Sequence, residues 1–125
     1  MIEAEYQDMF LKLLRRNNAY ATSIVGSMYQ SGQPDITCTS KYGVVSFIEL
    51  KMWRRMTVPT ADGLISLLRG PQVNVIVHQL WEKRKAPCWL VANISGTNKV
   101  CFITHDKTPL VDTTENLALW FATRQ

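Results

Sequence analysis

The sequence predicts an α/β domain in which a central β-sheet is flanked by helices. The chain has 125 residues, a length that fits one compact domain with its own buried core, and this domain is expected to span residues 1–125. Apolar residues recur at helical spacing near both ends, whereas the middle holds runs rich in β-branched and aromatic residues. These patterns predict the element order α-β-β-β-α-β-β-α.

The first helix is predicted over residues 3–17. Tyr6, Phe10 and Leu13 recur there at helical spacing and form one apolar face. Two arginines occupy the last predicted turn, where positive charge complements the helix dipole.

Three strands are predicted next, over residues 21–29, 34–39 and 44–51. Turn-forming Ser-Gly-Gln and Lys-Tyr-Gly sequences separate them. The third stretch is almost continuous in β-forming residues, which is typical of a strand buried on both faces. We therefore place it in the interior of the sheet.

The segment 52–70 has no regular pattern, because a proline and a glycine interrupt it, and only residues 63–68 suggest a helical turn. A helix is predicted over residues 71–85. Pro71 suits the first position of a helix, and apolar residues follow it at helical spacing.

Residues 89–94 and 100–104 are predicted to pair as a hairpin, because a Ser-Gly-Thr-Asn turn joins them. Asp112 and Glu115 stand three positions apart, as in a capping box, ahead of the apolar residues 117–121. This last pattern predicts a C-terminal helix.

The composition is that of an ordinary globular protein with a basic surface. Hydrophobic residues make up 46% of the chain and charged residues 19%. The net charge of +4 and the pI of about 9.1 suit a partner that carries phosphates, although solubility alone also explains such a charge. No run of eighteen apolar residues is present, so a membrane span is not expected.

The three cysteines indicate a reducing environment. Cys38, Cys88 and Cys101 lie too far apart for the C-x-x-C spacing of zinc ligands. Each falls in an apolar, strand-like stretch, so we expect buried, reduced thiols. The N-terminus lacks the basic and apolar regions of a signal peptide, and a cytoplasmic location is expected.

Two carboxylates are predicted to converge on a metal site. A hairpin brings Asp35 beside the strand that carries Glu49 and Lys51, which share one face because they stand two apart. Their carboxylate oxygens suit Mg²⁺, and the backbone carbonyl of Leu50 would add a further oxygen. Lys51 would position an attacking water or stabilise charge that develops on a phosphate.

Structural explanations of the same residues remain open. Asp35 follows a proline and is a common type of turn former. Glu49 and Lys51 would also suit an ion pair on an exposed face of the sheet. Phe47 lies on that face as well, which argues against its exposure.

These residues resemble the PD-(D/E)XK nuclease superfamily over most of the chain. Pro34 and Asp35 stand for the PD of the family, and residues 49–51 (Glu-Leu-Lys) for its (D/E)XK. Gly32 and the apolar run before the glutamate are similar to the subset that contains VRR-Nuc nucleases and archaeal-type Holliday-junction resolvases. The resemblance implies a restriction-endonuclease-like fold with a mixed central sheet.

The resemblance also implies two further site residues. Relatives carry a glutamate near the start of the first helix, for which Glu3 and Glu5 are candidates; Glu3 is preferred because it continues the apolar stripe of that helix. Relatives carry a glutamine at the start of the helix after the (D/E)XK strand, and Gln72 stands about there. Both positions also suit ordinary residues of a helix N-terminus. The expected catalytic set is Glu3, Asp35, Glu49, Lys51 and Gln72.

Several cations are candidate phosphate contacts. Arg54 and Arg55 follow the predicted catalytic strand directly, and Arg69 precedes the next predicted helix. Lys83, Arg84 and Lys85 form a basic run, for which a solvated surface is the slightly favoured explanation.

The resemblance implies a metal-dependent endonuclease that hydrolyses DNA, with Mg²⁺ as the cofactor and Mn²⁺ as a substitute. A chain of this size has no separate module for reading sequence, so structure-selective cutting of branched DNA is expected. The resemblance also implies a homodimer. A nicking or flap-cutting nuclease is one alternative. A nucleic-acid-binding protein that keeps the fold without catalysis, and a protein-interaction domain, are others.

Overall fold

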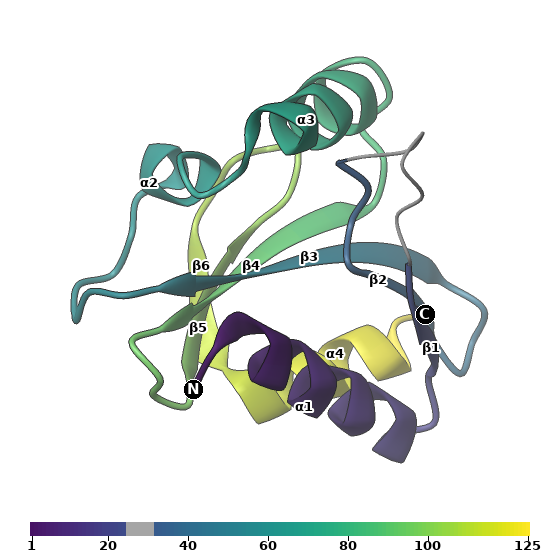
Figure 1. Cartoon of the computed structure of the whole chain (residues 1–125). Coiled ribbons are helices and arrows are strands. Elements are labelled where there is room, and N and C mark those ends of the chain that lie inside the picture. Colours follow the sequence, from purple (N-terminus) through teal and green to yellow (C-terminus); the bar gives the residue numbers. More distant parts are fainter. Residues whose placement is uncertain (25–31) are drawn as a thin grey trace.

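The structure is a computed structural model that describes residues 1–24 and 32–125, and within them a six-stranded sheet lies between two layers of helices (Figure 1). The strands are β1 (Tyr20–Ser23), β2 (Ile36–Thr39), β3 (Val45–Trp53), β4 (Cys88–Ile94), β5 (Lys99–Ile103) and β6 (Leu110–Thr113). The helices are α1 (Glu3–Arg16), α2 (Ala61–Ile65), α3 (Gly70–Gln72), the π-helix η1 (Val73–Glu82) and α4 (Thr114–Thr123).

The strands follow one another across the sheet in chain order. Neighbouring strands are antiparallel except β3 and β4, which are parallel. A parallel pair needs a long crossover connection, and here it consists of α2, α3 and η1. This crossover covers one face of the sheet, while α1 and α4 cover the other (Figure 1).

An apolar core lies on each face of the sheet. On one face, side chains of α1 and α4 such as Phe10 and Phe121 pack against Ile48 and Leu50 of β3. On the other face, the crossover packs on the later strands. The large buried residues of this second core include Leu64, Ile76, Trp81, Leu90 and Ile103.

The two faces of β3 have different characters. Ile48 and Leu50 belong to the core beneath α1 and α4, whereas Phe47 packs in the core beneath the crossover. Because side chains alternate along a strand, Glu49 and Lys51 project toward the crossover. Glu49 is 1% exposed and Lys51 is 8% exposed, so the alternative of an ion pair on an exposed face is wrong.

Helices α1 and α4 close the sheet by contacts between distant parts of the chain. The Tyr6 hydroxyl lies 2.9 Å from the Thr114 hydroxyl, in a buried hydrogen bond. The backbone N–H of Lys41 donates to the carbonyl of Ala122 at 3.0 Å. The face of the sheet opposite the crossover is therefore covered by two helices that hold each other in place.

The structure confirms the α/β class, a mixed sheet with helices on both faces, and the positions of most elements. The predicted strand over residues 21–29 forms β1 as far as Ser23, and its residues 25–29 lie outside the described part of the chain. The central strand is buried as predicted, although it continues two residues beyond Lys51. The three cysteines are buried and free, also as predicted.

The crossover differs from the sequence prediction in two ways. Its first half contains the short helix α2, whose N-cap Thr60 accepts a hydrogen bond from the backbone N–H of Gly63 at 3.0 Å. Its second half is mainly a π-helix rather than the predicted α-helix. The run of β-branched residues in this segment disfavours an α-helix, but it carries no signal for the wider turn.

The sequence prediction is wrong at two further points near the C-terminus. Strand β6 was not predicted, because its residues Leu110 and Val111 are both exposed and show no alternation. The capping box predicted from Asp112 and Glu115 is wrong by one residue. Thr113 is the N-cap of α4, and its hydroxyl accepts from the backbone N–H of Asn116 at 3.1 Å.

No helix in residues 1–24 and 32–125 is long and apolar enough to cross a membrane.

Candidate active site

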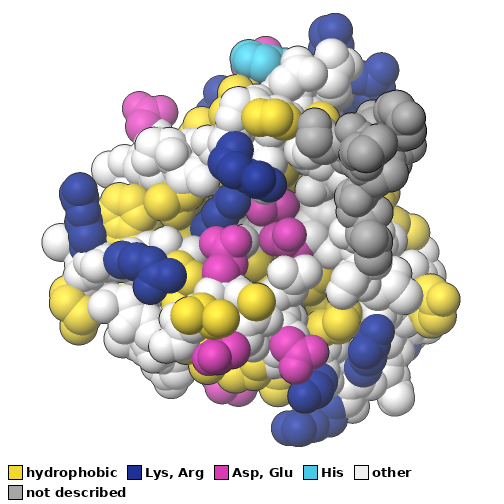
Figure 2. Space-filling model, viewed as in Figure 1, with side chains coloured by type: hydrophobic (Ala, Val, Ile, Leu, Met, Phe, Trp, Pro, Cys, Tyr) yellow, Lys and Arg dark blue, Asp and Glu magenta, His cyan; other side chains and the backbone are white. Residues whose placement is uncertain are grey.

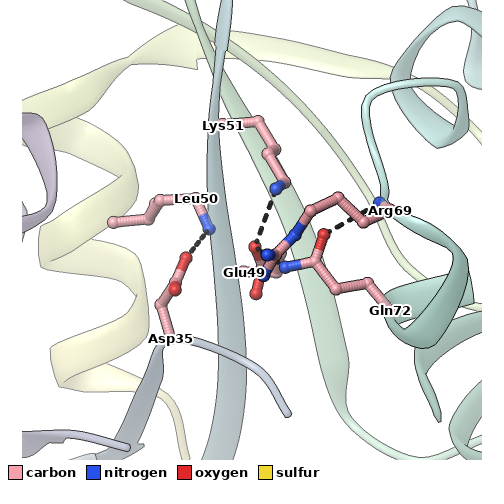
Figure 3. Close-up of polar contacts among 6 residues, drawn as sticks. All are labelled: Asp35, Glu49, Leu50, Lys51, Arg69 and Gln72. Carbon is pink, nitrogen blue, oxygen red and sulfur yellow. Dashed lines mark hydrogen bonds and ion pairs between the residues drawn. The ribbon is translucent and has the colours of Figure 1, made fainter. Parts of the chain in front are cut away.

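The candidate site begins where β2 separates from β3. The ladder between them ends at the pair Ile36 and Ile48, and Asp35 stands one residue before β2. Beyond this point the edge of β3 that faced β2 has no strand partner among the described residues. The N–H of Leu50 on this edge donates instead to Oδ2 of Asp35 at 2.9 Å (Figure 3). This hydrogen bond fixes the Asp35 carboxylate beside β3.

Glu49 is the most buried charged group of the site. Its Oε2 accepts a hydrogen bond from the Gln72 amide at 2.9 Å and lies 3.4 Å from Nζ of Lys51 (Figure 3). Its second oxygen, Oε1, is buried and has no hydrogen-bond partner among residues 1–24 and 32–125. A buried carboxylate oxygen without a partner is costly, because it has lost its water without gaining a substitute.

Both carboxyl groups have raised pKa values. Burial, together with the charge of nearby Asp35, raises the pKa of Glu49 to about 8, and Lys51 opposes the rise. Burial also raises the pKa of Asp35, against the hydrogen bond from Leu50 and the charges of Lys51 and Arg69. Two adjacent buried carboxylates resist ionising together unless a further cation lies between them.

These oxygens fit a hard divalent cation. Mg²⁺ is commonly held by one or two carboxylates together with waters, so Asp35 and Glu49 suffice. Oε1 of Glu49, which has no hydrogen-bond partner among the described residues, is available as a metal ligand. The N–H and C=O of a strand residue face the same edge, so the carbonyl of Leu50 lies on the edge where its N–H meets Asp35.

Glu3 does not form a group of metal ligands with Asp35 and Glu49 in the described part of the chain. Within the described residues, no three or more His, Cys, Asp or Glu side chains are grouped so that they could hold a metal ion. Glu3 is half-buried at the first residue of α1, and Glu5 is exposed. The preference for Glu3 over Glu5 stays a prediction.

Gln72 links the crossover to β3. It is 4% exposed, and its two amide atoms make different contacts. Its Oε1 accepts from the backbone N–H of Arg69 at 3.0 Å, as expected for a residue in the first turn of a helix. Its Nε2 donates to Glu49. The side chain thus has the ordinary helix-terminal role and also contacts the site.

Gly32 lies close to the same helix start. It is buried and has a φ of +92°, and a Cβ built on it would stand 2.3 Å from the carbonyl oxygen of Pro71. Gly32 is one of the residues that carry the family resemblance, but no local pattern in the sequence indicates this contact, which joins segments 39 residues apart.

The candidate phosphate contacts divide into two groups. Arg54 and Arg55 are exposed directly after β3 and border a groove of about 580 Å³ that reaches α2. The side chain of Arg69 runs from the start of α3 toward the carboxylates (Figure 3). Figure 2 shows basic side chains beside the acidic ones near the middle of this face.

Lys83, Arg84 and Lys85 form the second group. They are exposed and follow η1, at the end of the helical segment opposite Gln72. Arg84 donates to the carbonyl of Gln79 at 2.9 Å and to its side chain at 3.1 Å. Nothing in their contacts connects them with the site.

The sheet, the crossover and the two covering helices together form a mixed α/β fold. A solved structure with this fold is Hjc, a Holliday junction resolvase from the archaeal hyperthermophile Archaeoglobus fulgidus, with a TM-score of 0.51 over 91% of this chain and 92% of that one. The two sequences are 13% identical, so the likeness concerns the fold. No protein-family model matches the sequence, and no curated protein matches it either.

The raised pKa of Glu49 predicts how stability depends on pH without metal. In the folded protein this carboxyl keeps its proton up to a pH of about 8, whereas its ordinary value is 4.5. Folding therefore favours the protonated form, and stability should fall as the pH rises from 5 to 8. Glu49→Gln cannot ionise and should show a smaller fall. Thermal unfolding of both proteins in EDTA at pH 5 and pH 8 measures this, and equal slopes would contradict the assignment.

Proposed function

We propose that this protein is a metal-dependent endonuclease that hydrolyses phosphodiester bonds in DNA and prefers branched substrates. The observation that carries the proposal is the pair of half-buried Asp35 and buried Glu49, with Lys51 beside them and a Glu49 oxygen that has no hydrogen-bond partner among the described residues. The fold, which is like that of a Holliday junction resolvase, supports the same class of reaction. Kinship with VRR-Nuc nucleases is part of this proposal.

Asp35, Glu49 and the Leu50 carbonyl would hold the cation. A bound Mg²⁺, or Mn²⁺ in its place, would polarise the scissile phosphate and lower the pKa of the attacking water. Lys51 would orient that water or stabilise charge on the attacked phosphate. Gln72 would keep the Glu49 carboxylate in one orientation through its 2.9 Å hydrogen bond.

The cations around the site would supply most of the affinity for DNA. Arg54, Arg55 and Arg69 lie beside the carboxylates or directly after the catalytic strand, so contacts to backbone phosphates would place a strand across the site. Phosphate contacts carry no sequence information, which favours recognition of DNA shape over a fixed sequence.

A homodimer would let two such sites act on both strands of a junction. Within the described residues β6 is an edge strand, and Leu110 and Val111 on it are 49% and 47% exposed. Leu119 and Trp120 of α4 are exposed beside a hollow of about 340 Å³ that Leu110 and Trp120 both line. An edge strand pairs with the same edge of a second copy about a twofold axis, so we propose this surface as the dimer interface.

Substitution of the metal-site residues should separate binding from chemistry. Asp35→Asn should lower single-turnover cleavage by orders of magnitude, because the cation loses a ligand. Its DNA affinity in EDTA should persist or tighten, because a charge that repels phosphate is removed. Lys51→Ala should keep metal binding and still lose turnover.

Gel shifts in EDTA, Mg²⁺ and Mn²⁺ titrations, and cleavage of labelled four-way junction, flap, single strand and linear duplex measure these effects. Asp8→Asn is the matched control, since Asp8 is an exposed aspartate on α1. If folded Asp35→Asn cuts at nearly the wild-type rate, the metal site lies elsewhere. Binding without any cutting by the wild type would favour the non-catalytic alternative.

Replacing each of the two glutamates of the first helix by glutamine tests which of them belongs to the site. Glu3→Gln should reduce cleavage strongly and Glu5→Gln should do little, because only Glu3 continues the stripe that faces the sheet. Single-turnover rates of the two variants measure this, and the opposite ranking would show that the helix phase was misassigned.

The dimer should dissociate when charge is placed in its interface. Leu110→Lys and Trp120→Lys should each shift the protein to a monomer in light scattering at micromolar concentration, because two like charges would meet across the twofold axis. Tyr42→Lys, an exposed aromatic in the β2–β3 turn, is the control. A wild-type monomer that cuts linear duplex as well as junctions would rule out the dimer proposal.

A further inference from the structure

We propose that Gly32 is a positioning residue of the candidate site. Its backbone contact with Pro71 sets where α3 begins, and α3 in turn carries the Gln72 amide that holds Glu49. The inference rests on the proposed function of that site, but it concerns geometry that can be measured without any DNA cleavage.

The contact leaves no room for a side chain. A Cβ on Gly32 would lie 2.3 Å from the carbonyl oxygen of Pro71, 2.6 Å from its carbonyl carbon and 3.1 Å from the backbone nitrogen of Gln72. All three are backbone atoms, so they cannot move aside by a change of rotamer. An added methyl group would therefore push the start of α3 away from the loop.

The displacement required exceeds what the site tolerates. Restoring an ordinary contact of 3.4 Å from 2.3 Å needs a movement of roughly 1 Å. The hydrogen bond from Gln72 to Glu49 is 2.9 Å long, and such a bond is largely lost when it lengthens by that amount. The Gln72 side chain cannot restore the hydrogen bond by reaching toward Glu49, because its Oε1 accepts from the N–H of Arg69 in the same helix start.

The same short loop also leads to the other metal-site carboxylate. Asp35 follows Gly32 by three residues, and the intervening Pro34 is buried. Asp35 is held by the backbone of β3, and Gly32 rests against α3. The loop thus contacts both β3 and the start of α3. These two contacts together set the position of Asp35 relative to the Gln72 amide, which orients Glu49.

The chain offers a matched control for the conformational strain of a substitution. Gly43 has a φ of +88°, nearly the same as the +92° of Gly32, but a Cβ on Gly43 would meet nothing within 4 Å. Gly32→Ala and Gly43→Ala therefore both place alanine in the left-handed region, and only Gly32→Ala adds the collision with Pro71. A difference between them reports the contact.

The direct measurement is the NMR signal of the Gln72 side-chain amide in uniformly ¹⁵N-labelled protein without metal. In the wild type and in Gly43→Ala this amide should be shifted and protected from solvent exchange, because it donates to a buried carboxylate. In Gly32→Ala it should move to the position of a free glutamine. An unchanged Gln72 signal in folded Gly32→Ala would overturn the inference, whatever the activity.

Cleavage gives the functional test. Gly32→Ala should lose about 100-fold in single-turnover rate with Mg²⁺, the loss typical of a misplacement near 1 Å, and Gly43→Ala should stay close to the wild type. Affinity for DNA in EDTA should be unchanged in both. In a Gln72→Ala background the further effect of Gly32→Ala should largely disappear, because both changes break one link. Additive losses would overturn the inference.

A second variant covers the case in which Gly32→Ala does not fold. Gly32→Ala combined with Pro71→Gly loosens the helix start so that the added methyl group can be accommodated. This double variant should fold with a released Gln72 amide, and a retained contact to Glu49 would contradict the proposal. If the wild type cuts no DNA, the proposed function fails, while the NMR measurement still decides the role of Gly32.

Discussion

A carboxylate buried on the central strand is the constraint around which this part of the molecule is arranged. Glu49 is 1% exposed, and its pKa of about 8 shows how strongly the surroundings resist its charge. Two neighbouring side chains contact its carboxylate, Lys51 through an ion pair and Gln72 through a hydrogen bond. The nearby Asp35 carboxyl is electrostatically coupled to it. A purely structural site would contain a partner for each oxygen. Among residues 1–24 and 32–125 Oε1 has none, which leaves this oxygen available to a ligand.

The topology of the sheet explains why the site lies where it does. Strand β2 stops at Ile36, whereas β3 continues to Trp53 along its parallel partner β4. The edge of β3 that has no strand partner among the described residues therefore lies next to the loop that carries Asp35. The crossover required by the parallel pair then places α3 above the same stretch. Because β3 is longer than β2, residues of the loop before β2, of β3 and of the crossover lie together at this point.

Local patterns made part of this predictable from sequence, and distance in the chain explains what was missed. Asp35, Glu49 and Lys51 lie within one hairpin, so spacing and alternation sufficed to bring them together. The approach of Gly32 to Pro71, and the reach of Arg69 toward the carboxylates, depend on how the crossover packs, which no local pattern encodes. Strand β6 was missed because it has two exposed apolar residues and no alternation, and η1 because periodicity does not distinguish a π-turn from an α-turn.

The pairing of α1 with α4 has a consequence for the protein during its synthesis. The hydrogen bond of Tyr6 cannot form until Thr114, 108 residues later, has been synthesised. The hydrogen bond of Lys41 likewise requires Ala122. Until α4 has left the ribosome, the part of the apolar sheet face that α4 covers stays open, although the residues of the β2–β3 hairpin have already been synthesised. The nascent chain therefore has an open apolar core until α4 is available, and at that stage it is exposed to aggregation and to chaperones.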